Sequence, residues 1–168
     1  MTLATAASTL VCCIGNDLVA DDGVACRVFE RLQALELPGS PRVEQVGVGG
    51  LDLLELLTGA EGSLVVVDAV QFGAPPGTVH CLDWQDLPAA RGMAVSAHAI
   101  GLRETVEVGK VVCPDKLPSR IVLVGIEGRR FDELGGAMTP ETAAAVDTAA
   151  RRVRDLLFTF EQEAEVDE

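Results

Sequence analysis

Carboxylates follow the first apolar run of the chain, where a binding site could form. Residues 9–14 form that run, and Asp17, Asp21 and Asp22 separate it from a helix-like pattern that starts near Gly23. Carboxylates serve as metal ligands and as general bases. Asp22 could instead cap the helix by accepting backbone N–H bonds, but that alternative leaves the neighbouring Asp21 unexplained.

Another acid lies inside the most apolar segment. Asp68 occurs in "VVVDAV", and burial of a carboxylate is costly unless it is paired, hydrogen-bonded or bound to a metal. Asp68 could instead be a strand-end residue whose carboxylate accepts hydrogen bonds from the amides of a loop. His98, in "SAHAIGL", is one of two histidines, and a lone histidine is more often structural or exposed. The other, His80, is expected on an exposed edge strand without a functional role.

Asp22, Asp68 and His98 together offer two carboxylates and one imidazole. This set of oxygen and nitrogen donors suits a borderline divalent metal and leaves coordination positions open. The three residues lie on separate segments. Their spacing carries no information by itself, so the fold must bring them together.

The alternation of strand-like and helix-like patterns predicts an α/β fold. Strands are expected at residues 9–14, 43–48, 63–70, 78–83 and 120–128, and helices from residue 23 and at 50–57, 96–106 and 139–160. The β-branched run at 63–70 is typical of a parallel strand buried on both faces. The loop between 63–70 and 78–83 is too short for a parallel crossover. We therefore expect a three-layer sandwich: a twisted, mostly parallel five-stranded sheet with one antiparallel edge strand and helices on both faces.

Smaller features complete the predicted domain. One α/β domain is expected over residues 1–160, followed by a frayed acidic tail at 161–168. Thr139 is the predicted N-cap of the last helix, with Pro140 at its first position. The helix at 50–57 is expected to direct Leu51, Leu54 and Leu57 inward. Ligands of such folds bind beyond the carboxyl ends of the parallel strands, where Asp22 and Asp68 are expected.

Composition excludes several classes of partner. The 168 residues carry a net charge of −13, from 26 acidic against 13 basic residues, which argues against nucleic acid and membrane partners. The five cysteines form no CxxC pair and suit a reducing cytoplasm. Four of them are expected to be small core residues rather than nucleophiles: Cys12, Cys13, Cys26 and Cys81. The start of the sequence lacks the positively charged region of a signal peptide, so it is interpreted as the segment that leads into the first strand.

Common catalytic and nucleotide motifs do not fit. In "VGVGGLDLL", the third glycine of a dinucleotide loop would fall at Asp52. The chain also contains no GxSxG elbow and no HExxH helix, which excludes standard serine-hydrolase and zincin chemistry.

Four segments occur in a specific order between residues 15 and 128: "GNDLVADDGVACRVFERL", "VVVDAVQFGAPPGTV", "SAHAIGL" and "IVLVGIEG". This ordered set resembles the hydrogenase maturation endopeptidases, which trim the C-terminus of nickel–iron hydrogenase large subunits. The resemblance implies a twisted sheet between helices and a metal site formed by Asp22, Asp68 and His98. It also implies a single cut in a precursor that already carries nickel, with this nickel as the recognition element.

Two positions depart from the family pattern. Ala25 replaces a usual glycine, which should only tighten helix packing. Gln45 stands where an acid thought to assist the reaction is usual. Asp21 or Asp17 could supply a second carboxylate, and Asp21 is our candidate for a supporting acid or general base. The sequence thus predicts a nickel-dependent endopeptidase, with a non-catalytic metallochaperone or scaffold for the precursor as the alternative.

Overall fold

The computed structural model describes residues 8–47, 50–88 and 101–166. Its five strands form one sheet in the order β2-β1-β3-β5-β4. The strands are β1 (Ser8–Ile14), β2 (Arg42–Val46), β3 (Glu61–Val70), β4 (Val79–Asp83) and β5 (Arg120–Glu127). Four strands run parallel, and β4 pairs antiparallel with β5 at one edge. The predicted sheet, including its antiparallel edge strand, is confirmed.

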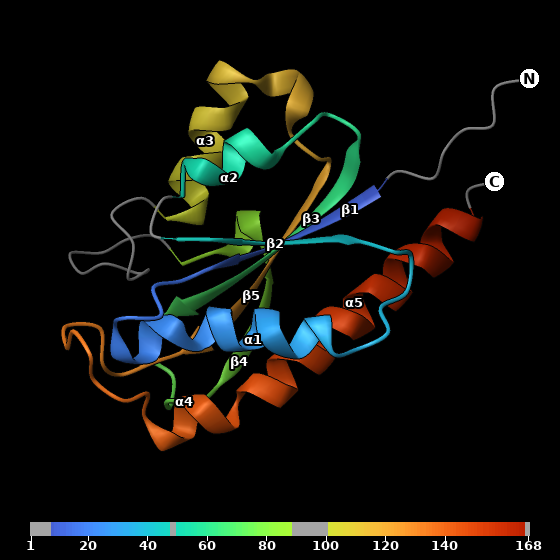
Figure 1. The fold of residues 1–168 in the computed structure, drawn as a ribbon. Coiled ribbons are helices and arrows are strands. Elements are labelled where there is room, and N and C mark those ends of the chain that lie inside the picture. Colours follow the sequence, from blue (N-terminus) through green and yellow to red (C-terminus); the bar gives the residue numbers. More distant parts are fainter. Residues whose placement is uncertain (1–7, 48–49, 89–100, 167–168) are drawn as a thin grey trace, which may run out of the picture.

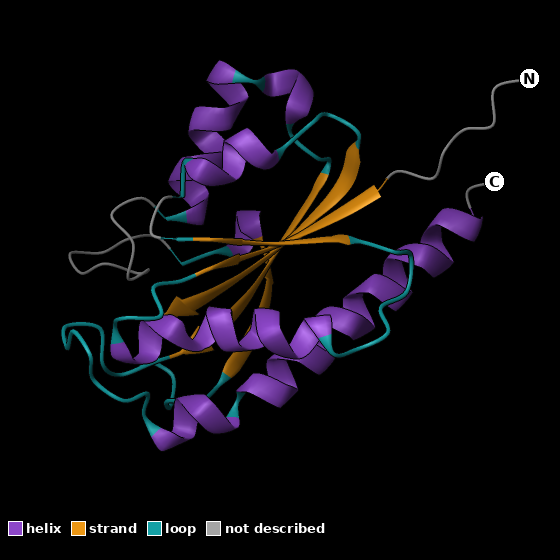
Figure 2. Ribbon diagram, in the orientation of Figure 1, coloured by secondary structure: helices purple, strands orange, loops and turns teal. Residues whose placement is uncertain are grey.

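Helices cover both faces of this sheet, which gives the expected three layers (Figures 1 and 2). The helices are α1 (Val24–Gln33), α2 (Asp52–Leu56), α3 (Leu102–Val112), α4 (Pro140–Ala144) and α5 (Val146–Val166). Helices α1, α4 and α5 lie on one face, and α2 and α3 on the other (Figure 1). In the described part of the chain, no helix combines the length and apolar character needed to cross a bilayer.

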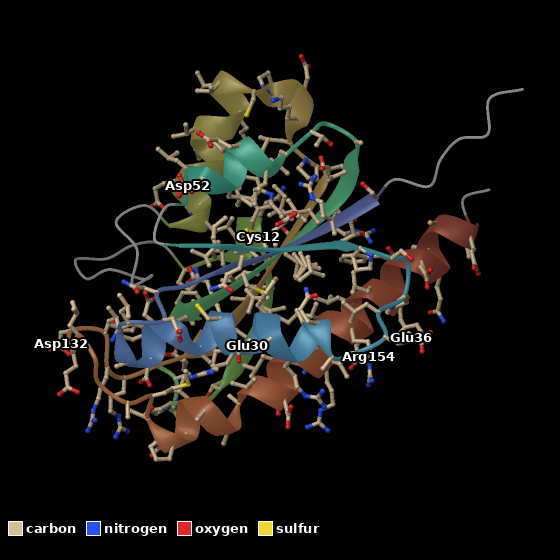
Figure 3. The ribbon with its side chains drawn as sticks, viewed as in Figure 1. Cys12, Glu30, Glu36, Asp52, Asp132 and Arg154 are labelled. Carbon is tan, nitrogen blue, oxygen red and sulfur yellow. The ribbon has the colours of Figure 1, made fainter. Side chains whose placement is uncertain are left out.

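Two hydrophobic clusters hold the layers together, one on each face. Because side chains alternate along a strand, β1 directs Val11 and Cys13 to the α1–α5 face and Leu10 and Cys12 to the α2–α3 face. Figure 3 shows Cys12 at the middle of the sheet and Glu30 on the helix α1. Strand β1 is therefore covered on both sides, as its continuous apolar sequence predicts.

The helices of the α2–α3 face differ in detail from the prediction. Leu57, which follows α2, is buried and Leu54 packs against the core, as predicted. The prediction was wrong for Leu51, which is 41% exposed, while Leu53 of α2 is buried. Helix α3 begins at Leu102 rather than at residue 96. The predicted start at residues 96–100 lies outside the described residues.

The last predicted helix is divided at Ala145 into α4 and α5. Helix α5 follows α1 along the sheet and continues to Val166, through most of the tail expected to be frayed (Figure 1). Arg120 of β5 contacts this end of α5: its guanidinium lies 2.5 Å from Glu163 and over the ring of Phe160.

Candidate active site

Two buried carboxylates lie at the carboxyl ends of the central strands. Asp68, near the end of β3, lies beside Ile14 of β1 and Gly125 of β5, and only 5% of it is exposed. Asp22 lies in the 3₁₀ turn η1 (Ala20–Gly23) that follows β1, and it is 4% exposed. The sheet therefore brings both predicted metal ligands to the edge where α/β folds bind ligands.

Asp22 faces the strand end rather than the helix. Its Oδ2 accepts a hydrogen bond from the backbone N–H of Asn16 at 3.1 Å, whereas the N-cap of α1 is Gly23. The alternative of Asp22 as a helix cap is therefore wrong. Gly15 allows this turn to close, because a Cβ there would lie 2.6 Å from the carbonyl oxygen of Asp22.

The third predicted ligand, His98, lies outside the described residues. Helix α3, which the prediction placed around it, begins four positions later at Leu102. Among the residues that the structure describes, no group of three or more histidine, cysteine or acidic side chains could hold a metal ion. The ligand set of Asp22, Asp68 and His98 therefore stays a prediction, of which the structure places two members at one edge of the sheet.

Asp21 binds two distant loops together. It is fully buried, and its Oδ2 accepts backbone N–H bonds from Arg129 at 2.7 Å and Arg130 at 2.9 Å. Its Oδ1 accepts from the backbone N–H of Thr139 at 2.7 Å and from the hydroxyl of Thr139 at 2.9 Å. Gly128 permits this approach, because a Cβ there would lie 3.0 Å from the Cβ of Asp21. These bonds fix the turn that carries Asp22 to the segment leading into α4.

The same bonds keep Asp21 ionised. Burial alone raises the pKa of a carboxyl group, but the backbone donors of Arg129, Arg130 and Thr139 and the Thr139 hydroxyl outweigh it and lower the pKa of Asp21 below its ordinary value. A general base needs a pKa near the working pH and access to the substrate proton. The geometry thus favours a supporting role for Asp21 over the predicted role of base. Thr139 precedes α4 as expected, but its hydroxyl serves Asp21.

Replacing Asp21 with Asn is expected to destabilise the fold by about 3 kcal/mol, because the amide turns a donor toward backbone N–H groups in a buried site. Urea unfolding at pH 7 measures this change. Asp17→Asn is the matched control, since Asp17 is exposed, and its effect should stay within about 0.5 kcal/mol.

The pH dependence follows from the lowered pKa of Asp21. Its contribution to stability is present above the unfolded-state pKa of about 3.9 and is lost as the pH falls toward the lower pKa of the folded state. The stability difference between the wild type and Asp21→Asn should therefore narrow below about pH 4. A variant of unchanged stability that has lost only its turnover would instead support the general-base role.

Glu127 organises the loop that follows Asp68. This buried residue ends β5, and its Oε1 accepts backbone N–H bonds from Phe72 at 2.7 Å and Ala74 at 3.1 Å. The Nε2 of His80 lies 3.2 Å from the same oxygen, and its ring meets Phe72 edge to face. His80 is therefore half-buried and structural, not exposed as predicted. The sequence prediction missed the role of Glu127, although a glutamate at the end of an apolar strand was a signal for it.

Gln45 is the last residue but one of β2, one register position before the level of Ile14 and Asp68. Its Nε2 lies 3.0 Å from the Sγ of Cys26 on α1, and the strand ends one residue later, at Val46. The first position beyond β2 is Gly47. Gln45 therefore contacts α1 at Cys26, whose thiol is close enough to Asp17 and Asp22 for these carboxylates to raise its pKa.

A comparison with protein families decides the class of the chain. The model of the hydrogenase maturation protease family matches residues 26–155, well over half of the sequence. The chain belongs to this family. The matched range includes Asp68 and His98 and begins after Asp22.

Individual relatives agree with this membership. The hydrogenase expression/formation protein HupD of Rhodobacter capsulatus is 37% identical over 150 residues, which cover 88% of this chain and 70% of HupD. HoxM of Cupriavidus necator is 31% identical over 86% of this chain and 71% of its own length. Among solved structures, the hydrogenase maturating endopeptidase HybD from E. coli superimposes with a TM-score of 0.76 at 26% identity, covering 90% of this chain and 93% of HybD.

Three of the cysteines of this maturation protease are poorly suited to act as a nucleophile. Cys12, Cys13 and Cys26 are buried, as predicted for core residues. Burial raises the pKa of each thiol, that of Cys12 to about 12, and for Cys26 the nearby Asp17 and Asp22 add to the effect. The thiolate is therefore strongly disfavoured near neutral pH. Cys81 is exposed on β4, where a core position was expected.

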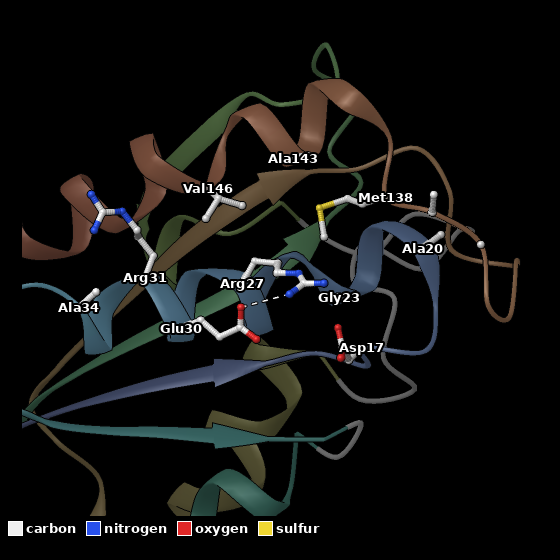
Figure 4. A pocket seen from close by; sticks show the side chains of 12 residues that line it. Asp17, Ala20, Gly23, Arg27, Glu30, Arg31, Ala34, Met138, Ala143 and Val146 are labelled. Carbon is white, nitrogen blue, oxygen red and sulfur yellow. Dashed lines mark hydrogen bonds and ion pairs between the residues drawn. The ribbon is translucent and has the colours of Figure 1, made fainter.

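The protease also has a groove of about 720 Å³ beside the η1 turn (Figure 4). One wall is the outer face of α1, and the other is formed by residues 136–146. Asp17, Ala20 and Gly23 lie at its end nearest to Asp22. We call this feature the α1 groove.

Proposed function

We propose that this protease removes the C-terminal extension of a nickel-loaded nickel–iron hydrogenase large-subunit precursor by a single cut. Family membership supports a protease that acts in hydrogenase maturation. The observation that carries the finer proposal is the position of Asp22 and Asp68, two buried carboxylates at neighbouring strand ends. We further propose that the reaction takes place in the cytoplasm, in keeping with five cysteines of which none is in a disulfide among the described residues.

In this proposal, Asp22, Asp68 and His98 bind the nickel that the precursor carries. Two carboxylate oxygens and one imidazole nitrogen suit a borderline divalent ion and leave positions for the precursor's own ligands. Nickel held there would polarise the scissile carbonyl or activate a water molecule. The metal thus belongs to the substrate, and the protease supplies the ligands that recognise it.

Asp21 is assigned to positioning. The hydrogen bonds that it accepts tie the η1 turn to Arg129, Arg130 and Thr139, so the carboxylate of Asp22, one residue later, is held at a fixed place. Sites of this kind need rigid support around their ligands, since small displacements lower affinity and rate. This assignment of Asp21 leaves the general base of the proposed hydrolysis unassigned.

The proposed cut is tested by the mass of the product. Purified protease is incubated with a nickel-loaded large-subunit precursor, and both chains are analysed by intact-mass spectrometry. The expected result is the loss of one C-terminal peptide from the precursor, with no other cleavage. A stable complex with precursor of unchanged mass would instead show the alternative, a metallochaperone or scaffold.

A further inference from the structure

Asp68 lies on the face of the sheet that α2 and α3 cover. Side chains alternate along a strand, and Val66 and Val70, two positions to either side of Asp68 on β3, belong to the hydrophobic cluster of that face. The α1 groove lies over the opposite face, between α1 and the segment that contains α4. Side chains that support Asp68 directly are therefore expected on the α2–α3 face.

His80 and Glu127 lie on the same face as Asp68, on the next two strands. Asp68 pairs with Gly125 of β5, and His80 of β4 pairs with Gly125 from the other side. Paired residues of neighbouring strands direct their side chains to one face. Glu127 follows Gly125 by two positions on β5, so it shares this face as well. A buried carboxylate thus lies one step beyond the row of Asp68, toward the carboxyl edge of the sheet.

Glu127 fixes both ends of the loop that joins β3 to β4. Its Oε1 accepts the backbone N–H groups of Phe72 at 2.7 Å and Ala74 at 3.1 Å, where the chain leaves β3. Its own backbone N–H donates to the carbonyl of Thr78 at 2.9 Å, and its carbonyl accepts from the N–H of Gly77 at 2.8 Å, where the chain enters β4. One residue of β5 therefore determines how the chain continues from the strand that carries the metal ligand.

Phe72 links this loop to the start of α3. Its ring packs against the cluster that contains Leu102, the first residue of α3, and it meets the ring of His80 edge to face at 5.1 Å between centroids. Leu102 follows the predicted ligand His98 by four positions. Displacement of the loop would therefore disturb the core between β3 and the start of α3.

We propose that Glu127 is a positioning residue for the cleavage reaction, because it fixes the loop after β3 and thereby the place of Asp68. This inference rests on the proposed function, in which Asp68 binds the nickel of the precursor. Glu127 is 2% exposed, and its Oε1 is bonded to the loop, so it acts through Asp68 rather than on the substrate. Loss of groups that hold metal ligands in place typically costs about 10–100-fold in affinity or activity.

Glu61 provides a matched control at the opposite end of β3. It is buried, and its carboxylate accepts the backbone N–H groups of Thr58 at 3.0 Å and Gly59 at 3.1 Å, in the loop that enters the strand. Both acids thus hold a loop at one end of β3, but only Glu127 lies at the carboxyl edge, where Asp68 is. Replacing either acid with Asp withdraws the carboxylate from its donors by one methylene group.

The test measures kcat and KM for nickel-loaded precursor with Glu127→Asp and Glu61→Asp, together with thermal unfolding of both variants. Both substitutions should lower the melting temperature, because each removes hydrogen bonds from a buried carboxylate. Glu127→Asp should lower kcat at least about tenfold, whereas Glu61→Asp should stay within about twofold of the wild type. Equal kcat values for the two variants would overturn the inference.

A third variant, Glu127→Gln, separates geometry from charge. The amide oxygen of Gln can accept the same bonds from Phe72 and Ala74 at the original length of the side chain. This variant should therefore keep kcat within about threefold of the wild type, well above that of Glu127→Asp. If Glu127→Gln is as slow as Glu127→Asp, the charge of Glu127 takes part in the reaction itself and the positioning role is wrong.

Hydrogen exchange of the protease alone tests the positioning without any cleavage. Glu127→Asp should accelerate amide exchange in residues 67–74, at the end of β3, whereas Glu61→Asp should accelerate it in residues 58–64. Unchanged exchange in residues 67–74 of Glu127→Asp would contradict the inference. If the wild type does not cut the precursor, the proposed endopeptidase function fails, while the exchange pattern still decides whether Glu127 fixes the strand end that carries Asp68.

Discussion

Replacing Asp68 with Asn is expected to lower the rate of precursor processing more than 100-fold. Residues that merely support metal ligands cost about 10–100-fold in affinity or activity when they are changed, so loss of a ligand should cost at least as much. Asn keeps the shape of the side chain but removes the charge that binds a cation. His98→Ala should have an effect of the same size. Processing is measured as the initial rate of product formation at a fixed concentration of nickel-loaded precursor.

Stability measurements separate this effect from misfolding. Asp68 is buried in the central strand β3, so Asp68→Asn is checked by thermal unfolding before its activity is measured. Asp155→Asn, at an exposed position of α5, is the control and should process precursor at the normal rate. A folded Asp68→Asn or His98→Ala protein with normal processing would exclude that residue from the ligand set.

Much of the fold could be predicted because its signals are local. The apolar, β-branched run of β3 indicated a strand buried on both faces, and the short loop before β4 required an antiparallel neighbour. From a parallel sheet it also follows that Asp22 and Asp68 lie at the same edge, since the carboxyl ends of parallel strands share one edge. The structure confirms this placement for both carboxylates.

The partners of buried polar groups could not be predicted in the same way. Asp21 binds Thr139, which lies 118 positions further along the chain, and Glu127 lies 47 positions from His80. No periodicity links such residues, because the fold alone brings them together. The sequence indicated that Asp21 is unusual. Whether it acts as a general base or supports the turn depends on the groups that donate hydrogen bonds to it, and these lie far along the chain, between β5 and α4.

The division of the last helix has a similar origin. Its apolar pattern is continuous from residue 139 to 160, so one helix was expected. In the structure, Thr139 is bound to Asp21, and the hydroxyl of Thr142 lies 3.4 Å from the carbonyl oxygen of Glu127. These contacts tie α4 to the site, while Ala149 and Val153 of α5 pack in the core shared with α1. Helical propensity alone does not report such competing contacts.

Enzyme that has been stripped with a chelator is expected to cut nickel-loaded precursor at the rate of untreated enzyme. The reason is the predicted ligand set, in which Asp22, Asp68 and His98 provide three donors from separate segments and leave the remaining positions to the precursor. A resident catalytic zinc site also has three protein ligands, with one water in the fourth position. In the proposed site the precursor's own ligands complete the coordination, so free nickel should bind the enzyme weakly. Rates are measured by gel shift or intact mass.

The reciprocal experiment gives the larger effect. Nickel-free precursor should remain uncut when it is mixed with enzyme that has been supplied with nickel and then desalted, a loss of more than about 100-fold relative to nickel-loaded precursor. Metal analysis of the desalted enzyme shows whether it retained nickel, and Asp68→Asn enzyme provides the background rate. If stripped enzyme is inactive and nickel-supplied enzyme cuts the nickel-free precursor, the metal resides in the protease. The chain would then act as a conventional metalloprotease, and the recognition of substrate-borne nickel through Asp22 and Asp68 would be wrong.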